Sequence, residues 1–164
     1  MALRLCKIVL TANSVLFLML VVFNNTTDYG SNYQYIEHVL SMDTTFPGNS
    51  GMWRAITRPA VYRMFYAGII LWEAAAAALL GLGVVRLWAA RRGSAQAWRR
   101  AKTWAVVGFT LSLTQWYTAF LTIGGEWFLM WQSRVWNGQE AASRMFAVMA
   151  LSLIFLALPD PEDA

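Results

Sequence analysis

Four long apolar runs constrain the fold of this chain more than any other feature. They extend over residues 5–23, 61–85, 104–123 and 142–158. Each is close to the roughly 20 residues that an α-helix needs to cross the hydrocarbon core of a bilayer. A chain of 164 residues that is 58% hydrophobic and 13% charged has little sequence left for a second domain,. We therefore predict an all-α fold, a four-helix transmembrane bundle in which residues 1–164 form a single membrane domain.

The ends of these runs carry helix-boundary signals. The first run resembles a signal peptide, but no small-residue cleavage site follows it, so we expect it to be retained as a helix,. Pro59 suits the first turn of the second helix, and Gly124-Gly125 commonly ends a helix such as the third,. The fourth run is short for a membrane span, so we expect its helix to begin near Gln139 and to end before Pro159,.

The distribution of basic residues predicts the orientation of the chain. Arg4 and Lys7 come before Ile8, where the uninterrupted apolar part of the first run begins, and residues 86–102 between the second and third runs contain five arginines and one lysine. Short loops rich in Lys and Arg stay in the cytoplasm. We therefore expect both termini in the cytoplasm and residues 24–58 and 125–140 on the outer side.

The first outer loop is long enough to contain structure of its own. Apolar residues recur at helical spacing between Ser31 and Met42, which predicts a short helix lying on the bilayer surface,. A second short helix is expected over residues 51–57, after a turn rich in Pro, Gly and Asn at 43–51,. The predicted fold thus includes one or two short interfacial helices in this loop.

The second outer segment combines tryptophans with hydrogen-bonding side chains. Such a mixture is typical of the lipid headgroup region, where the segment would anchor the helix ends. It is also typical of a recognition surface for another subunit or a lipid, and both interpretations stay open. The candidate residues of this outer interface are Glu126, Trp127, Trp131, Gln132, Trp136 and Asn137, together with His38 and Asp43 of the first outer loop.

The motifs of the two outer segments carry a family resemblance. They are Asp28-Tyr29, His38-Val39-Leu40-Ser41-Met42-Asp43, Trp53-Arg54-Ala55-Ile56, Gly125-Glu126-Trp127-Phe128, Met130-Trp131-Gln132-Ser133 and Trp136-Asn137-Gly138-Gln139. In these motifs the chain resembles a bacterial family of predicted small integral membrane proteins, a domain of unknown function. The resemblance covers essentially the whole chain. It implies four spans and a location in the bacterial inner membrane, and it brings no established activity.

Polar side chains inside the apolar runs form a candidate site. A carboxyl group within a span is costly, so Glu73 requires polar partners,. Counting depth along each helix places Gln115 and Asn13 within a turn of Glu73,. We predict an intramembrane polar cluster of Glu73, Gln115 and Asn13. The cluster either fixes the helix register through hydrogen bonds, or binds a proton, a cation or a polar headgroup.

Several kinds of chemistry find no support in the sequence. His38 is the single histidine, so a haem held by two histidines of this chain is excluded,. The acidic residues near His38 lack the spacing of a known metal site, and Cys6 lies at the opposite side of the membrane from His38,. The basic residues do not form the stripe that nucleic-acid binding requires. We expect no metal, no cofactor and no nucleic-acid partner.

Three functional hypotheses follow from these patterns. The first is a non-enzymatic inner-membrane protein, acting as an accessory or assembly subunit of a membrane complex or as a homo-oligomer. The second is a small transporter or channel, or a lipid- or quinone-binding protein, that uses the polar cluster around Glu73. The third is an enzyme at the outer interface that uses Glu126, Asp28, His38 or Asp43, although nothing in the sequence brings these residues together.

Overall fold

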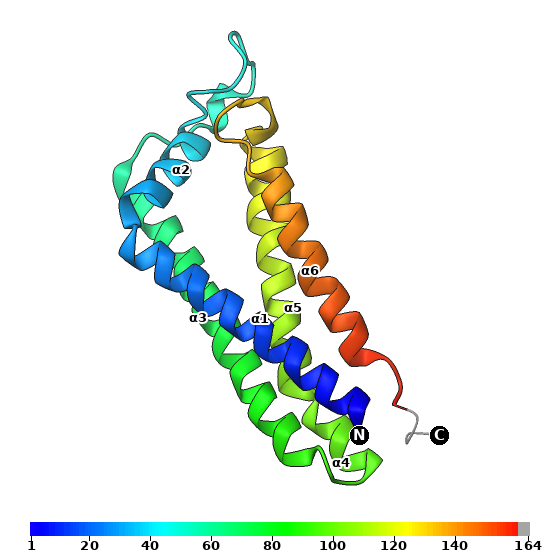
Figure 1. Ribbon diagram of the computed structural model, residues 1–164. Coiled ribbons are helices and arrows are strands. Elements are labelled where there is room, and N and C mark those ends of the chain that lie inside the picture. The colour runs from blue at the N-terminus through cyan, green and yellow to red at the C-terminus, as the bar shows by residue number, and fades with distance from the viewer. Residues whose placement is uncertain (161–164) are drawn as a thin grey trace.

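The computed structural model describes residues 1–160, which fold into a bundle of helices (Figure 1). The long helices are α1 (Ala2–Thr27), α3 (Pro59–Ala90) and α6 (Gln139–Ala157), together with the continuous series of α4 (Ala95–Ala101), α5 (Thr103–Thr114) and the π-helix η2 (Gln115–Trp127). The connections contain α2 (Tyr29–Ser41) and the short 3₁₀ helices η1 (Met52–Arg54) and η3 (Met130–Gln132). With Ala95–Trp127 taken as one unit, four helices are long and apolar enough to cross a membrane. The four-helix prediction is confirmed.

The bundle is closed at one end and spread at the other (Figure 1). We call these the α4 end, where the N-terminus and the end of α6 also lie, and the α2 end. Toward the α2 end, α3 diverges from the series formed by α5 and η2, and α2 with the neighbouring loops covers the opening. α2 packs along the first turns of α3, where the ring of Tyr29 lies 4.7 Å from that of Tyr66.

Two glycines allow α3 and α5 to meet closely. A Cβ atom added at Gly83 would lie 2.7 Å from the backbone nitrogen of Ala105, and one added at Gly108 would lie 2.8 Å from the backbone nitrogen of Leu80. Each helix thus places a glycine against the backbone of the other. Small residues at such crossings are the usual basis of helix packing in membranes, because they permit extensive van der Waals contact.

The glycine pair at the end of the third helix acts differently from the sequence prediction. The helix continues through Gly124 and Gly125 to Trp127 as the π-helix η2. Both glycines are buried, and a Cβ atom at Gly125 would meet the side-chain amide of Gln139. The prediction that this pair ends the helix is therefore wrong. Gly125 instead makes room for the first turn of α6 to pack against η2, and Gly124 lies against the side chain of Met130.

The α4 end is closed by a buried charge cluster around Asp160. Its Oδ2 accepts hydrogen bonds from Lys7 Nζ at 3.0 Å, Lys102 Nζ at 3.0 Å and Trp98 Nε1 at 2.8 Å. Lys7 also donates to the carbonyl oxygen of Leu158 at 2.6 Å. The cluster joins α1, α4 and the start of α5 to the segment after α6. Two lysines that the sequence assigned to cytoplasmic loops are therefore buried members of the bundle.

The glycine contact predicts that valine destabilises the protein at one position of α3 and has little effect at a position two residues away. Gly83→Val should force α3 and α5 apart and lower the free energy of unfolding by about 1–3 kcal/mol, the usual cost of overpacking. Gly81→Val is the matched control, because a Cβ atom at Gly81 meets nothing within 4 Å. Thermal unfolding in detergent would compare the two variants. Equal stabilities would contradict the close contact.

The charge cluster predicts a pH-dependent contribution to stability. Burial alone would raise the pKa of Asp160, but the hydrogen bonds from Lys102, Lys7 and Trp98 outweigh it and hold the pKa below its ordinary value of 3.8,. The carboxylate therefore stabilises the folded state fully above pH 3.8, and the effect is lost as the pH falls through the lowered pKa,.

Asp160→Asn should consequently unfold more easily than the unchanged chain near neutral pH, by about 2 kcal/mol for a charged hydrogen-bonded group. The difference in the free energy of unfolding between the two proteins should disappear as the pH falls below 3.8. Melting curves from pH 2.5 to 7 in detergent would measure it. A gap that is independent of pH would show that the charge of Asp160 does not stabilise the fold.

Candidate functional site

The carboxyl group of Glu73 lies near the middle of α3 and is the centre of a buried hydrogen-bond network. The residue is 1% exposed. Its Oε2 accepts a hydrogen bond from Asn25 Nδ2 at 2.7 Å, and its Oε1 accepts one from Gln115 Nε2 at 3.2 Å. Asn25 comes from the last turn of α1 and Gln115 is the first residue of η2. The network therefore ties three helices together at the level where the bundle begins to open.

The structure brings Gln115 to Glu73 but does not bring Asn13 there. Asn13 is on the exposed side of α1, and Asn25 bonds to the carboxylate in its place. The depth count assumed that the midpoints of α1 and α3 lie at the same depth in the membrane. In the structure α1 continues to Thr27, and its last turn is the part that meets Glu73. The hydroxyl of Tyr66 holds this turn in place by donating to the carbonyl oxygen of Asn25 at 2.8 Å.

A cavity of about 270 Å³ lies beside this network, and we call it the Glu73 cavity. Its polar groups are those of Glu73, Asn25 and Asn32 together with the hydroxyls of Tyr35 and Tyr66. The rest of the lining is aliphatic and aromatic, including Trp116 and Phe120 of η2 and the first turn of α6. Apart from the Tyr35 hydroxyl, the cavity therefore has its polar groups around Glu73 and an apolar lining elsewhere.

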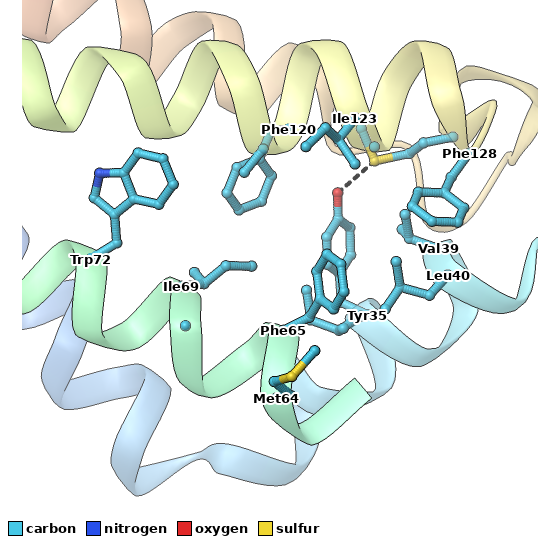
Figure 2. A pocket seen from close by; sticks show the side chains of 15 residues that line it. Tyr35, Val39, Leu40, Met64, Phe65, Ile69, Trp72, Phe120, Ile123 and Phe128 are labelled. Carbon is cyan, nitrogen blue, oxygen red and sulfur yellow. Dashed lines mark hydrogen bonds between the residues drawn. The ribbon is translucent and has the colours of Figure 1, made fainter. Parts of the chain in front are cut away.

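A second cavity of about 330 Å³ lies between α2, α3 and η2, and we call it the Met64 cavity. Figure 2 shows its side chains converging from the three helices, with Trp72 and Phe120 near one end and Phe128 and Leu40 near the other. Met64 lines it and is 63% exposed, and Gly68 lines it one turn later. The cavity thus reaches the outward-facing surface of α3, which would contact lipid.

The two cavities share a wall. The side chains that line both of them are Tyr35, Ile36, Ile69 and Phe120. Tyr35 is held across the opening by a hydrogen bond from its hydroxyl to Met130 Sδ at 2.6 Å (Figure 2). Burial raises the pKa of this hydroxyl well above its ordinary value of 10,. The hydroxyl is therefore a neutral donor at every physiological pH.

The π-helix η2 shapes this region. It runs for 13 residues, and its i→i+5 hydrogen bonds make it wider than an α-helix,. The buried side chains Gln115 and Trp116 and the cavity-lining Phe120 face α3 and α6, while Thr122 is exposed and bonds to the carbonyl oxygen of Tyr117. Single-turn π segments within α-helices occur frequently at functional sites, and η2 is longer than these.

The candidate residues of the two outer segments meet at the α2 end. Gln132 Oε1 accepts hydrogen bonds from the backbone nitrogen of Phe46 at 3.1 Å and from Asn49 Nδ2 at 3.3 Å. The guanidinium of Arg54 donates to the carbonyl oxygens of Glu126 and Trp127 at 3.3 and 3.0 Å. The two loops are therefore fastened to each other, and Glu126 takes part through its backbone.

Other members of this group have local structural contacts. The ring of His38 stacks on Trp136 at 4.6 Å, and its Nδ1 lies 2.8 Å from Asp43 Oδ2. Asn137 Oδ1 accepts a hydrogen bond from the backbone nitrogen of Gln139 at 3.1 Å, at the start of α6. Trp127 and Trp131 remain about half exposed. The structure thus separates the predicted interface into residues that join the loops and aromatic residues that face outward.

The sequence did not point to the residues that enclose the cavities. Asn25 carries a signal that could have been used, because it directly follows the first apolar run within a polar stretch. Tyr35, Trp72 and Phe120 carry none, since aromatic side chains in apolar segments usually pack against neighbouring helices or lipid. Their role depends on the divergence of α3 from η2, which no local pattern encodes.

Comparison with known proteins gives one family. The model of the family described as predicted small integral membrane protein (DUF2165) matches residues 3–159. Apart from Ala2, this range includes the four membrane-length helices, and it includes both cavities and the loops of the α2 end. No curated protein and no solved structure matches the chain.

The network predicts that two substitutions of Glu73 lower stability to different extents. Glu73→Leu would leave the amides of Asn25 and Gln115 without their acceptor and should lower the free energy of unfolding by about 1–3 kcal/mol,. Glu73→Gln keeps a carbonyl acceptor, so its decrease in the free energy of unfolding should be less than half as large. Adding Gln115→Leu to Glu73→Leu should lower the free energy of unfolding little further, because the hydrogen bond between residues 73 and 115 is already lost. Strictly additive effects in thermal unfolding would contradict the coupling.

Proposed function

The chain belongs to the family of predicted small integral membrane proteins, and we propose that it binds a lipid- or quinone-like molecule within the bilayer. The observation that carries this proposal is the pair of adjoining cavities at the α2 end, one of which has a polar side around Glu73. An amphipathic molecule needs such a combination of an apolar channel and a polar side. Among the sequence hypotheses, the geometry therefore favours ligand binding.

The sizes and linings of the cavities fit a ligand of this class. Small-molecule sites typically measure about 300–1,000 Å³ and are largely apolar with a few polar groups that set the orientation. The Met64 cavity measures about 330 Å³, and apart from Tyr35 its side chains are apolar or have their polar group bonded elsewhere, as Trp72 Nε1 is to Leu111. The tail of the ligand would lie there, and its head would lie toward Asn25, Asn32 and Glu73 in the Glu73 cavity.

The shared wall is consistent with a single ligand that spans both cavities. Tyr35 and Phe120 belong to different helices, α2 and η2, and their rings stack 6.3 Å apart. We propose that rotation of the Phe120 ring joins the two volumes, whereas Tyr35 is held by its hydrogen bond to Met130. The hydroxyl of Tyr35, as a neutral donor, could bond to a carbonyl or phosphate oxygen of the ligand.

Hydrogen bonding of Glu73 supports binding in preference to ion passage. Both carboxyl oxygens already accept hydrogen bonds from amides of this chain. A polar group that is satisfied in this way can orient a ligand head without exposing an unpaired charge to the hydrocarbon. We accordingly place the non-enzymatic binding role ahead of a transporter or channel.

The proposal includes a location and an orientation. We propose that the protein lies in a bacterial inner membrane with both termini in the cytoplasm. Five of the arginines, at positions 86, 91, 92, 99 and 100, belong to the α4 end, where the N-terminus and the end of α6 also lie. Such an accumulation of positive charge favours the cytoplasmic side. The cavities would then open in the outer half of the bilayer.

A second candidate role is that of an accessory or assembly subunit or a homo-oligomer. It is favoured by the large aromatic side chains that face outward at the α2 end, among which Trp53 is 73% exposed. Trp53 and Trp127 pack edge to face, with the guanidinium of Arg54 5.5 and 5.4 Å from their rings. Exposed tryptophan and arginine are enriched at the centres of protein interfaces.

Gly68 allows the ligand-binding proposal to be tested without disturbing the bundle. It lines the Met64 cavity, and a Cβ atom there would meet nothing within 4 Å. Gly68→Leu should therefore fill the cavity and remove at least nine tenths of the lipid or quinone that purifies with the protein. Gly81→Leu is the matched control, since it lies in the same helix, has equally free space and lies outside both cavities. It lines a separate apolar groove between α1 and α3, so a loss of ligand that is specific to Gly68→Leu assigns the ligand to the Met64 cavity.

Extraction and mass spectrometry of the bound molecules would measure this effect, and native mass spectrometry would read the oligomeric state of the same samples. Thermal unfolding would establish that both variants are folded. If Gly68→Leu retained as much ligand as Gly81→Leu, the binding proposal would be wrong. A defined oligomer with no bound ligand would favour the second candidate role.

A further inference from the structure

A third cavity, of about 460 Å³, lies at the α4 end and is independent of the proposed ligand site. It is formed where α3, α4 and α5 meet, and Arg86, Arg100 and Trp104 surround a floor of four alanines. We propose that it binds the phosphate of an anionic phospholipid headgroup. Arginine suits this task because its guanidinium group offers paired donors that match phosphate oxygens.

The charges around this cavity are not offset by carboxylates in the described part of the chain. Within residues 1–160, the acidic side chain at the α4 end is Asp160, which is buried and bonded to Lys7 and Lys102. The other described acidic residues belong to the α2 end or, as Glu73, to the middle of α3. Among the side chains of residues 1–160, an anion is therefore the complement that the cavity lacks.

Two neighbouring arginines, Arg91 and Arg4, have contacts of their own with other groups of the chain. The guanidinium of Arg91 lies 4.1 Å from the ring of Trp88 and donates to the carbonyl oxygen of that residue at 2.7 Å. Arg4 is buried and donates to the carbonyl oxygen of Gly93 at 2.8 Å. Arg86 and Arg100 are exposed and come from different helices, so both can approach one phosphate from two sides.

The surroundings favour a lipid over a soluble phosphate compound. Trp104 is 41% exposed at the edge of the cavity, and tryptophan is enriched at the level of the headgroups,. Along α3 and α5, Val85 and Val107 continue from the cavity as exposed apolar surface. A phospholipid could place its phosphate between the arginines and its acyl chains along these valines. Basic pockets between membrane helices are known to accept anionic headgroups in this manner.

The test compares two double variants with the same change of charge. Arg86→Gln with Arg100→Gln removes both guanidinium groups of the cavity, whereas Arg91→Gln with Arg92→Gln removes two at the same end but outside it. Native mass spectrometry would measure the binding of phosphatidylglycerol and phosphatidylcholine to each folded, detergent-solubilised protein. We expect the cavity variant to bind phosphatidylglycerol about tenfold more weakly, and the control variant less than threefold more weakly.

Further measurements distinguish a lipid phosphate from a free phosphate, and the cavity at the α4 end from the ligand site at the α2 end. Phosphatidylcholine binding should change little in either variant, and inorganic phosphate at millimolar concentration should not displace phosphatidylglycerol. The Gly68→Leu protein should retain this binding, because its substitution is at the other end of the bundle. Equal losses in both double variants would overturn the site in favour of general surface attraction. Complete displacement by inorganic phosphate would overturn the lipid assignment.

Discussion

The contact between α3 and α5 is closest where Gly83 faces Ala105 and Gly108 faces Leu80, and the arrangement of the whole bundle depends on it. Helices that touch backbone to backbone at one end and carry large side chains at the other must diverge. On α3 and η2 the side chains toward the α2 end include Trp72 and Phe120, which are far bulkier than glycine. The cavities are therefore a consequence of glycine placement along the two helices, and α2 with the loops encloses them.

The network around Glu73 lies at the level where this divergence begins. A buried carboxyl group in hydrocarbon is tolerated only when its oxygens are bonded, and here the donors come from α1 and η2,. The same bonds hold α1 and η2 to α3 just before the helices separate. The structural and ligand-binding interpretations of the cluster are thus compatible. A network that fixes three helices also gives the cavity beside it a polar side of fixed geometry.

The sequence predicted the features that depend on the composition of a single helix. It did not predict the features that depend on how the helices cross and diverge in space. The four spans follow from apolar length, and the pairing of Glu73 with Gln115 follows from depth. Asn13 was misplaced because α1 extends past its apolar run and meets α3 with its last turn. Gly124 and Gly125 resemble a helix stop, and only the packing of Gln139 shows why the chain stays helical there.

The two ends of the bundle differ in the way they use charge. At the α4 end, the carboxylate of Asp160 is bonded to Lys7 and Lys102 inside the protein. Among residues 1–160, the exposed arginines nearby have no carboxylate beside them. At the α2 end, hydrogen bonds and aromatic contacts join the loops, and Arg54 donates to backbone carbonyl oxygens. α3 and α5 are in backbone contact toward the first end and diverge toward the second. A bundle with this asymmetry can be anchored by lipid headgroups at its rigid end while its opposite end admits a molecule from the bilayer.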